Sequence, residues 1–381
     1  MLVPSLAELT GVLDQWYPPA TAESWDAIGL TCGDPAADVS RVLLAVDCVP
    51  DTVAEALDYR AGLLLTHHPL LLSGVHGVAA DNPKGALVHR MIRAGIAHLV
   101  AHTNADVAEH GVSAALADRL GLIDSRPLQA DPAQALDQLT VFVPQSSAEA
   151  VRSALAAAGA GAFGHYADSS FEVAGTGRFR PLPGAAPALG QVGMLSELPE
   201  IGLSMVLARS RRAAVLAALR TSHPYEEVAF ELTEQPRLAA DTGTGRVGRL
   251  DEPCTLAELV DTVVARLPRT AWGIRAAGRG DQVIRTVAVC GGSGASYTEL
   301  ARSAGADAYL TSDLKHHSTI EAVTERAGSA EAPMALIDAA HWATEAPWLN
   351  TVAGLLAGHF GDRVEVRVSE LVTDPWTLHA R

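Results

Sequence analysis

Short, uninterrupted apolar runs alternate with helical stretches in two separate parts of the chain. The runs are Val42–Asp47, Gly62–Thr66 and Ile96–Ala101 in the first part, and Val287–Cys290, Asp307–Thr311 and Met334–Asp338 in the second. Continuous apolar runs separated by helices are typical of parallel strands in a sheet that is covered on both faces. The pattern therefore predicts an α/β fold built from two α/β halves.

The two halves share a further feature at the end of their second run. In each, a threonine is followed by polar residues that can act as ligands: Thr66-His67-His68 in the first half and Thr311–His317 in the second. We therefore predict two pseudo-repeated halves that form one metal-binding unit. Ligands of open α/β sheets bind beyond the carboxyl ends of the strands, and these residues fall at that edge.

The segment between the halves differs in composition and pattern, with loops rich in Gly, Pro and Ala and with shorter expected strands. Its elements are expected in the order β-α-β-β-α-β, which is the ferredoxin-like motif. The expected strands and helices are Leu139–Val143, Ser147–Ala158, Phe171–Ala174, Leu203–Ala208, Arg211–Leu219 and Val228–Leu232. We predict a first α/β half at residues 1–127, an inserted ferredoxin-like α+β domain at 128–245 and a second α/β half at 246–381.

Composition restricts the partners and the location of the protein. The net charge of −16 disfavours binding to nucleic acid phosphates, so small molecules or metals are the expected partners. The four cysteines have no CxxC spacing, which argues against a disulfide framework or a thiolate zinc site and fits a reducing cytoplasm. No window reaches the roughly 18 apolar residues of a membrane span, and the N-terminus lacks a signal peptide pattern. A soluble, unprocessed cytoplasmic protein is expected.

Histidines and carboxylates gather after the apolar runs. His67 and His68 are adjacent, and neighbouring side chains on an extended backbone point to opposite sides, so each is expected to reach a different ion of a pair. His341 and Glu345 are spaced i, i+4 and share one face of a helix. Asp106 and Glu345 are the available carboxylates to bridge two ions. Imidazoles and carboxylates suit zinc, iron or manganese, so we predict two divalent ions per chain.

Two further features near these residues allow more than one interpretation. His102 lies four residues before Asp106 and could orient a ligand or move a proton, or it could be a hydrogen-bonded structural histidine. Gly291-Gly292-Ser293-Gly294 follows a run and precedes a helical stretch, a geometry in which backbone N–H groups hold an anion. It lacks a Walker A lysine and the full GxGxxG spacing. A tight turn without a ligand is the competing interpretation.

Together these motifs resemble the dinuclear metal centre hexameric proteins, the family named for NGG-one-interacting factor three. Its members are often labelled GTP cyclohydrolase I type 2 homologues. The resemblance spans nearly the whole chain and rests on His67-His68-Pro69, His102–Asp106, Gly291–Gly294, Thr311–His317 and Asp338–Glu345. It departs from the family pattern at a few positions. Ala27 stands where asparagine is usual, Ser312 and Ala340 replace glycines, and His316 and Trp342 stand where tyrosine is common.

The resemblance implies a toroidal homohexamer with a two-metal site in each subunit and an insert similar to CutA and PII-like domains. It implies metal ligands at His67, His68, Asp106, His341 and Glu345. The expected activity is hydrolysis of a nucleotide or a related small molecule by a metal-activated water, which attacks C8 of guanine in a GTP cyclohydrolase-type reaction. Residues 291–294 would hold a phosphate, and His102 or His317 would move protons.

Two other classes of function fit the same residues. A metal carrier or chaperone would hold exchangeable iron or another divalent ion at the five ligands without turning over a substrate. A regulatory hexameric scaffold is the second alternative. A fold and a metal centre do not define a substrate, so the motifs alone favour the site over any particular reaction.

Overall fold

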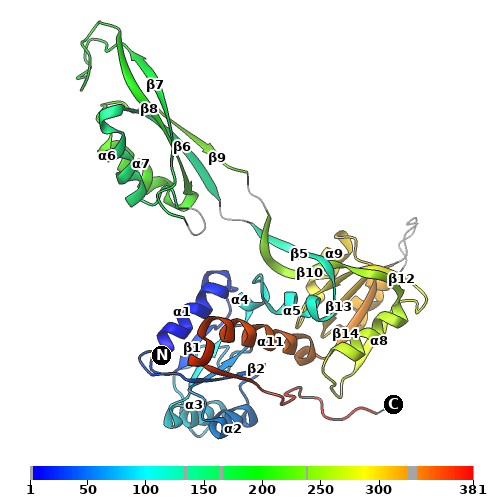
Figure 1. Ribbon diagram of the computed structural model, residues 1–381. Helices are drawn as coiled ribbons and strands as arrows, with labels where there is room; N and C mark the ends of the chain where they lie inside the picture. The colour runs from blue at the N-terminus through cyan, green and yellow to red at the C-terminus, as the bar shows by residue number, and fades with distance from the viewer. Residues whose placement is uncertain (1–2, 133–134, 163–165, 237–238, 325–332, 381) are drawn as a thin grey trace. The chain divides into compact units, whose positions relative to one another are not determined.

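A computed structural model of the protein describes residues 3–132, 135–162, 166–236, 239–324 and 333–380 (Figure 1). The chain divides into two compact units. The larger consists of Met1–Asp131 and Asp241–Arg381, and the smaller of Pro132–Ala240. The fold is mixed α/β with three sheets in the described part of the chain, two in the larger unit and one in the smaller.

The first sheet of the larger unit has the strand order β1-β4-β3-β2-β15. The strands are β1 (Gly29–Cys32), β2 (Arg41–Ala45), β3 (Leu63–Thr66), β4 (Ala97–Val100) and β15 (Glu365–Val368). All neighbours pair in parallel except β1, which is antiparallel to β4. Alternate residues of β2 enter opposite faces: Val42 and Leu44 join one buried cluster, and Leu43 and Ala45 join another.

Helices cover both faces of this sheet. They are α1 (Leu6–Trp16) and α11 (His341–Phe360) on one face, and α2 (Pro50–Tyr59) and α3 (Pro83–Ala94) on the other. The short helix α4 (Thr103–Asp106) follows β4. Helix α11 follows the last parallel strand of the second sheet but packs on the first sheet. It therefore brings residues that are distant in the sequence to the edge of the first sheet.

The second sheet has the strand order β11-β14-β13-β12-β10-β5. Its strands are β5 (Ile123–Pro132), β10 (Ala239–Thr255), β11 (Ile274–Ala277), β12 (Val283–Val289), β13 (Ala308–Ser312) and β14 (Ala335–Ala339). The central three strands are parallel, and β10 and β11 are antiparallel to their neighbours β12 and β14. The helices α5 (Val112–Arg119) and α8 (Leu256–Arg266) pack on one face, and α9 (Thr298–Ser303) and α10 (His316–Val323) on the other.

The parallel strands predicted from the apolar runs are confirmed as β2, β3, β4, β12, β13 and β14. The predicted halves do not coincide with the two sheets, however. Strand β15 lies in the segment assigned to the second half, yet it pairs with β2 in the first sheet. Its residues alternate between exposed and half-buried, so it lacks the continuous apolar run that revealed the central strands. Edge strands β1 and β11 were not predicted either, because they too lack a continuous apolar run.

The smaller unit contains an antiparallel sheet of order β7-β8-β6-β9 and two helices. Its elements are β6 (Leu136–Pro144), α6 (Ala148–Ala157), β7 (Phe171–Phe179), β8 (Ser196–Ala208), α7 (Arg212–Ser222) and β9 (Phe230–Glu234). Alternate residues of β6 and β8 pack against both helices. Among the described residues, no helix of either unit is long and apolar enough to cross a bilayer.

Candidate metal centre

Four histidines converge in the larger unit because of where the strands end. His67 and His68 directly follow β3, and His102 follows β4 as the N-cap of α4. His341 is the first residue of α11, so the helix that packs on the first sheet carries it to the same edge. The ring centroids of His67 and His102 are 5.0 Å apart, and those of His68 and His341 are 5.2 Å apart. The carboxyl edge of the first sheet therefore holds a cluster of imidazoles.

Glu345 lies at the centre of this cluster, one helical turn after His341. Its Oε1 is 2.9 Å from Nε2 of His341 and 3.5 Å from Nε2 of His67, and its Oε2 is 3.3 Å from Nε2 of His68. The residue is only 2% exposed, and Oε2 makes no hydrogen bond. A buried carboxylate oxygen without a donor is costly unless another group compensates it. An oxygen in this state, facing the Nε2 of His68, fits the chemistry of a metal ion.

The far nitrogen of every histidine in the cluster has a hydrogen-bond acceptor. The acceptors of the Nδ1 atoms are Ala101 O for His67 (3.0 Å), Asp47 Oδ1 for His68 (2.7 Å), Asp26 Oδ1 for His102 (2.8 Å) and Asp313 Oδ2 for His341 (2.6 Å). A carbonyl or carboxylate accepts but cannot donate, so each Nδ1 carries the proton. Each Nε2 of a neutral ring then has its lone pair free, as a metal-ligating histidine requires.

The structure brings together all five residues expected to bind metal. His68, His341 and Glu345 offer ligand atoms within 4.8 Å of one another, and so do His67, His68 and His102. Asp106 joins through its Oδ1, which lies 3.7 Å from Nε2 of His67. His102 is therefore as well placed for a metal ion as for proton transfer.

The expectation that His67 and His68 point to opposite sides is wrong. Their rings lie 4.9 Å apart with a tilt of 48°, and both face Glu345. The physical reason is that β3 ends at Thr66, so the two histidines stand in a bend where the alternation of an extended strand no longer holds. They approach different oxygens of one carboxylate instead.

The pKa shifts of the clustered side chains show how charge is distributed in the site. Burial lowers the pKa of His68, but Glu345 and Asp47 outweigh it and raise the pKa to about 11. The same balance, with Glu345 and Asp313, raises the pKa of His341 to about 9. Burial opposes ionisation of Glu345, yet the three neighbouring histidines hold its pKa well below the usual range. The site thus gathers positive charge, as protons when no metal is bound, around a buried anion.

The glycine loop at 291–294 lies beside the cluster, but its backbone is largely occupied. The amides of Gly291, Gly292 and Gly294 donate to the hydroxyls of Ser113, Thr344 and Thr311. A Cβ on Gly292 would lie 2.5 Å from Glu345 Oε1 and 3.1 Å from His341 Nε2. These contacts favour the tight-turn interpretation, in which glycine leaves room for Glu345 and His341.

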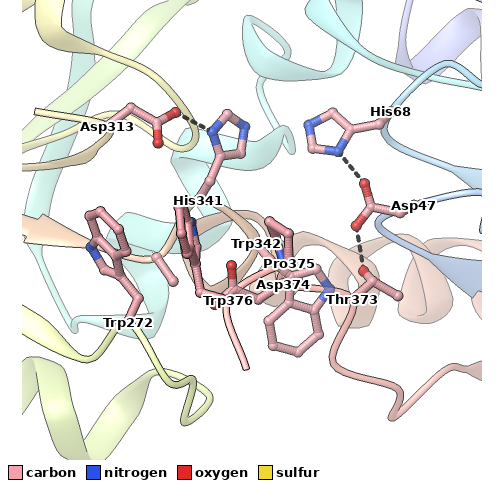
Figure 2. Close-up of a pocket in the computed structure, with 11 residues that line it drawn as sticks. Asp47, His68, Trp272, Asp313, His341, Trp342, Thr373, Asp374, Pro375 and Trp376 are labelled. Carbon is pink, nitrogen blue, oxygen red and sulfur yellow. Dashed lines mark hydrogen bonds and ion pairs between the residues drawn. The ribbon is translucent and has the colours of Figure 1, made fainter. Parts of the chain in front are cut away.

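Two cavities border the cluster. One of about 460 Å³ is lined by His102, Asp106, His341, Glu345 and the loop residues Gly291–Ser293, together with Trp25 and Tyr297. The other, of about 310 Å³, is lined by His68 and His341 with their partners Asp47 and Asp313, and by residues of the C-terminal segment (Figure 2). Among the described residues that line the two cavities, none is a lysine or an arginine.

His317 makes none of the contacts that define the cluster. It lies exposed on α10, and its ring is 5.2 Å from that of His316. The structure therefore gives no support to its expected role in proton transfer.

Asp26, Asp47 and Asp313 orient the histidine rings, and sequence reasoning gave none of them that role. Asp47 and Asp313 follow the first and second parallel strands of their sheets, so their position after apolar runs was an available signal. Asp26 precedes β1, and its proximity to the cluster depends on β1 pairing antiparallel with β4. That pairing could not be read from the residues around it.

Comparison with known proteins agrees with these observations. The family model described as Duf34/NIF3 (NGG1p interacting factor 3) matches residues 4–375. A Mycobacterium tuberculosis protein named GTP cyclohydrolase 1 type 2 homolog is 48% identical over 374 residues, covering 98% of this chain and 97% of the relative. The crystal structure of a Bacillus cereus protein related to NIF3 has a TM-score of 0.75 and 32% identity, covering 99% of this chain and 100% of that one. The Staphylococcus aureus protein SA1388 has a TM-score of 0.81 and 26% identity, covering 99% of both chains.

Proposed function

The chain belongs to the Duf34/NIF3 family, and on that premise we propose that it is a dinuclear metal-dependent hydrolase of a small molecule. The observation that carries the proposal is the buried Glu345 carboxylate, which faces three imidazole Nε2 atoms and has one oxygen without a hydrogen bond. His67, His68, Asp106, His341 and Glu345 would hold two divalent ions such as zinc, iron or manganese. Ions of this kind lower the pKa of a bound water to about 7 and so supply a nucleophile at neutral pH.

Glu345 is the proposed bridge between the ions. Its two oxygens face different histidines, His341 and His67 at Oε1 and His68 at Oε2. A bidentate carboxylate between two sets of imidazoles suits a pair of ions better than a single one. Asp106, next to His67, is the second carboxylate that would offset their charge.

His102 is the proposed proton-transfer group, with metal ligation as its alternative role. It lines the larger cavity, and Asp26 fixes its ring through Nδ1. Burial and the neighbouring His67 lower its pKa, which keeps the ring neutral at pH 7 and leaves Nε2 able to accept a proton. His317 remains a prediction without a supporting contact.

The larger cavity supports a substrate of nucleobase or nucleoside size. Its volume of about 460 Å³ suits a small molecule, but its described lining includes no lysine or arginine to neutralise a triphosphate. The glycine loop adds little for a phosphate, because three of its four amides already donate to side chains. A nucleotide would need the metal ions, or groups outside this chain, to hold its phosphates.

A metal carrier remains the second candidate because part of the cluster is accessible. The side chains of His341 and Asp106 are 34% and 32% exposed, which gives an ion a route in and out. A carrier would use the same five ligands without a substrate. Metal transfer and hydrolysis are therefore the two activities to compare.

Three architectural features belong to the same proposal. The strand order β11-β14-β13-β12, with β11 antiparallel at the edge, matches the order β1-β4-β3-β2, with β1 antiparallel at the edge, which supports a pseudo-repeat of the two halves. The order β9-β6-β8-β7 with two helices supports a ferredoxin-like insert, with Pro132–Ala240 as its compact part within the proposed 128–245. The proposed toroidal homohexamer rests on the family resemblance. The proposed location is a reducing cytoplasm, which the four free thiols support.

The decisive experiment incubates metal-loaded protein with guanosine and with GTP and measures products by mass spectrometry. We expect a product one water heavier, formed from guanosine at least as fast as from GTP, because the described lining of the larger cavity has no lysine or arginine for phosphates. Chelation and Asp106→Asn should each abolish product formation, whereas Asp251→Asn, at an exposed aspartate, should not. If neither compound reacts while the protein passes its metal to a competing apoprotein, the carrier replaces the hydrolase.

A further inference from the structure

The cavity of about 310 Å³ beside His68 and His341 has features that the proposed hydrolysis does not use (Figure 2). Three indoles, Trp272, Trp342 and Trp376, form much of its wall. Trp376 comes from the irregular C-terminal segment, which Thr373 holds in place by donating its hydroxyl hydrogen to Asp47. The described lining contains carboxylates and histidines but no lysine or arginine.

One carboxylate oxygen in this wall lacks a hydrogen-bond donor. Asp47 accepts hydrogen bonds from His68 and Thr373, and Asp313 accepts one from His341. Asp374 differs: the residue is 8% exposed, and its Oδ2 is buried without a hydrogen bond. Because an unpaired buried carboxylate oxygen is costly, this atom calls for a donor that the described residues do not supply.

The indoles are suited to a flat cation. The guanidinium carbon of Arg275 already lies over the Trp272 ring, 4.3 Å from its centroid. The ring centroid of Trp376 is 5.7 Å from that of Trp272, with the planes tilted by 41°. Trp376 is 60% exposed, so one aromatic face at the mouth is accessible. Indole faces bind cations more strongly than other aromatic rings.

We propose that this cavity binds a small organic cation of the guanidinium or amidinium type, which stacks on the indoles and donates N–H groups to Asp374 Oδ2. A planar cation with paired donors meets both requirements at once, since it offers a face to the rings and an edge to a carboxylate. This cavity is distinct from the proposed substrate cavity, although His341 lines both, and none of the five proposed metal ligands supplies the acceptor. It therefore goes beyond the proposed hydrolysis.

Benzamidine and its neutral isostere benzamide test the proposal directly. Binding to the full-length, metal-loaded protein is measured by calorimetry and by quenching of tryptophan fluorescence. We expect benzamidine to bind at least about 10-fold more tightly than benzamide. Asp374→Asn should weaken benzamidine binding by about 10-fold or more, whereas the exposed control Asp251→Asn should leave it unchanged.

Trp376→Leu provides a second variant, and because Trp376 is exposed, its substitution does not disturb a buried position. It should also weaken benzamidine binding and reduce the quenching, with metal content equal to that of the wild type. Equal binding of benzamidine and benzamide, or wild-type affinity in both Asp374→Asn and Trp376→Leu, would overturn the proposal. Metal content measured on the same samples separates this outcome from a failure of the metal centre.

Discussion

Glu345→Gln should lose both metal ions, with each affinity falling by about 100-fold or more, the upper end of the range for disturbed metal sites. The substitution keeps the side-chain volume but removes the charge that faces His67, His68 and His341. In the wild type that charge offsets positive charge on both sides of the carboxylate. An amide offers one oxygen and one nitrogen donor, and the donor would point toward an imidazole or an ion. Both sites should therefore weaken together.

The measurement is metal content after reloading and dialysis, with circular dichroism to show that the variant is folded. Glu370→Gln, at an exposed glutamate, is the matched control and should retain wild-type metal. If Glu345→Gln keeps one ion at wild-type affinity, Glu345 is a terminal ligand and the bridge is wrong.

Gly292→Ala should likewise remove metal, because the added methyl group would lie 2.5 Å from Glu345 Oε1 and 3.1 Å from His341 Nε2. Glu345 is buried and cannot move away without losing its place among the histidines. We expect metal affinity to fall by at least about 10-fold, as for other disturbances of a ligand's position. The φ of +65° adds backbone strain of about 1 kcal/mol.

Gly305→Ala separates the two effects. Gly305 has a φ of +80°, and nothing lies within 4 Å of a Cβ built there. This control should lose about 1 kcal/mol of stability while binding metal normally. Metal affinity is measured by titration, and stability by denaturant unfolding. If Gly292→Ala keeps its metal but loses affinity for inorganic phosphate, the loop is an anion site after all.

The central strands were predictable because both faces of each parallel strand are buried, which leaves a continuous apolar run such as Leu63–Leu65. Strands with one exposed face have no continuous apolar run, so their sequence pattern is harder to recognise. Strand β8 begins at Ser196, seven residues before the expected start at Leu203, because its first half alternates exposed and half-buried residues. Strand β15 was missed because it is short and charged at alternate positions.

The proposed metal ligands could be selected from the sequence because histidines and carboxylates follow the apolar runs and their motifs match a family. The residues that orient them depend on topology. Asp26 reaches His102 because an antiparallel edge strand starts where its neighbour ends. The glycine loop shows the limit of motif reasoning, since its sequence fits an anion cradle while its amides bond to Ser113, Thr344 and Thr311.

The number of metal ions per chain tests the central claim most directly. Protein stripped with a chelator, reloaded with zinc and dialysed is analysed for zinc and for protein concentration. The structure contains two candidate ligand groups that share His68, one formed by His67, His68 and His102 and the other by His68, His341 and Glu345. Because Glu345 lies among histidines of both groups, we expect a plateau at two equivalents per chain. A firm plateau at one equivalent, or no retained zinc, would contradict the dinuclear centre.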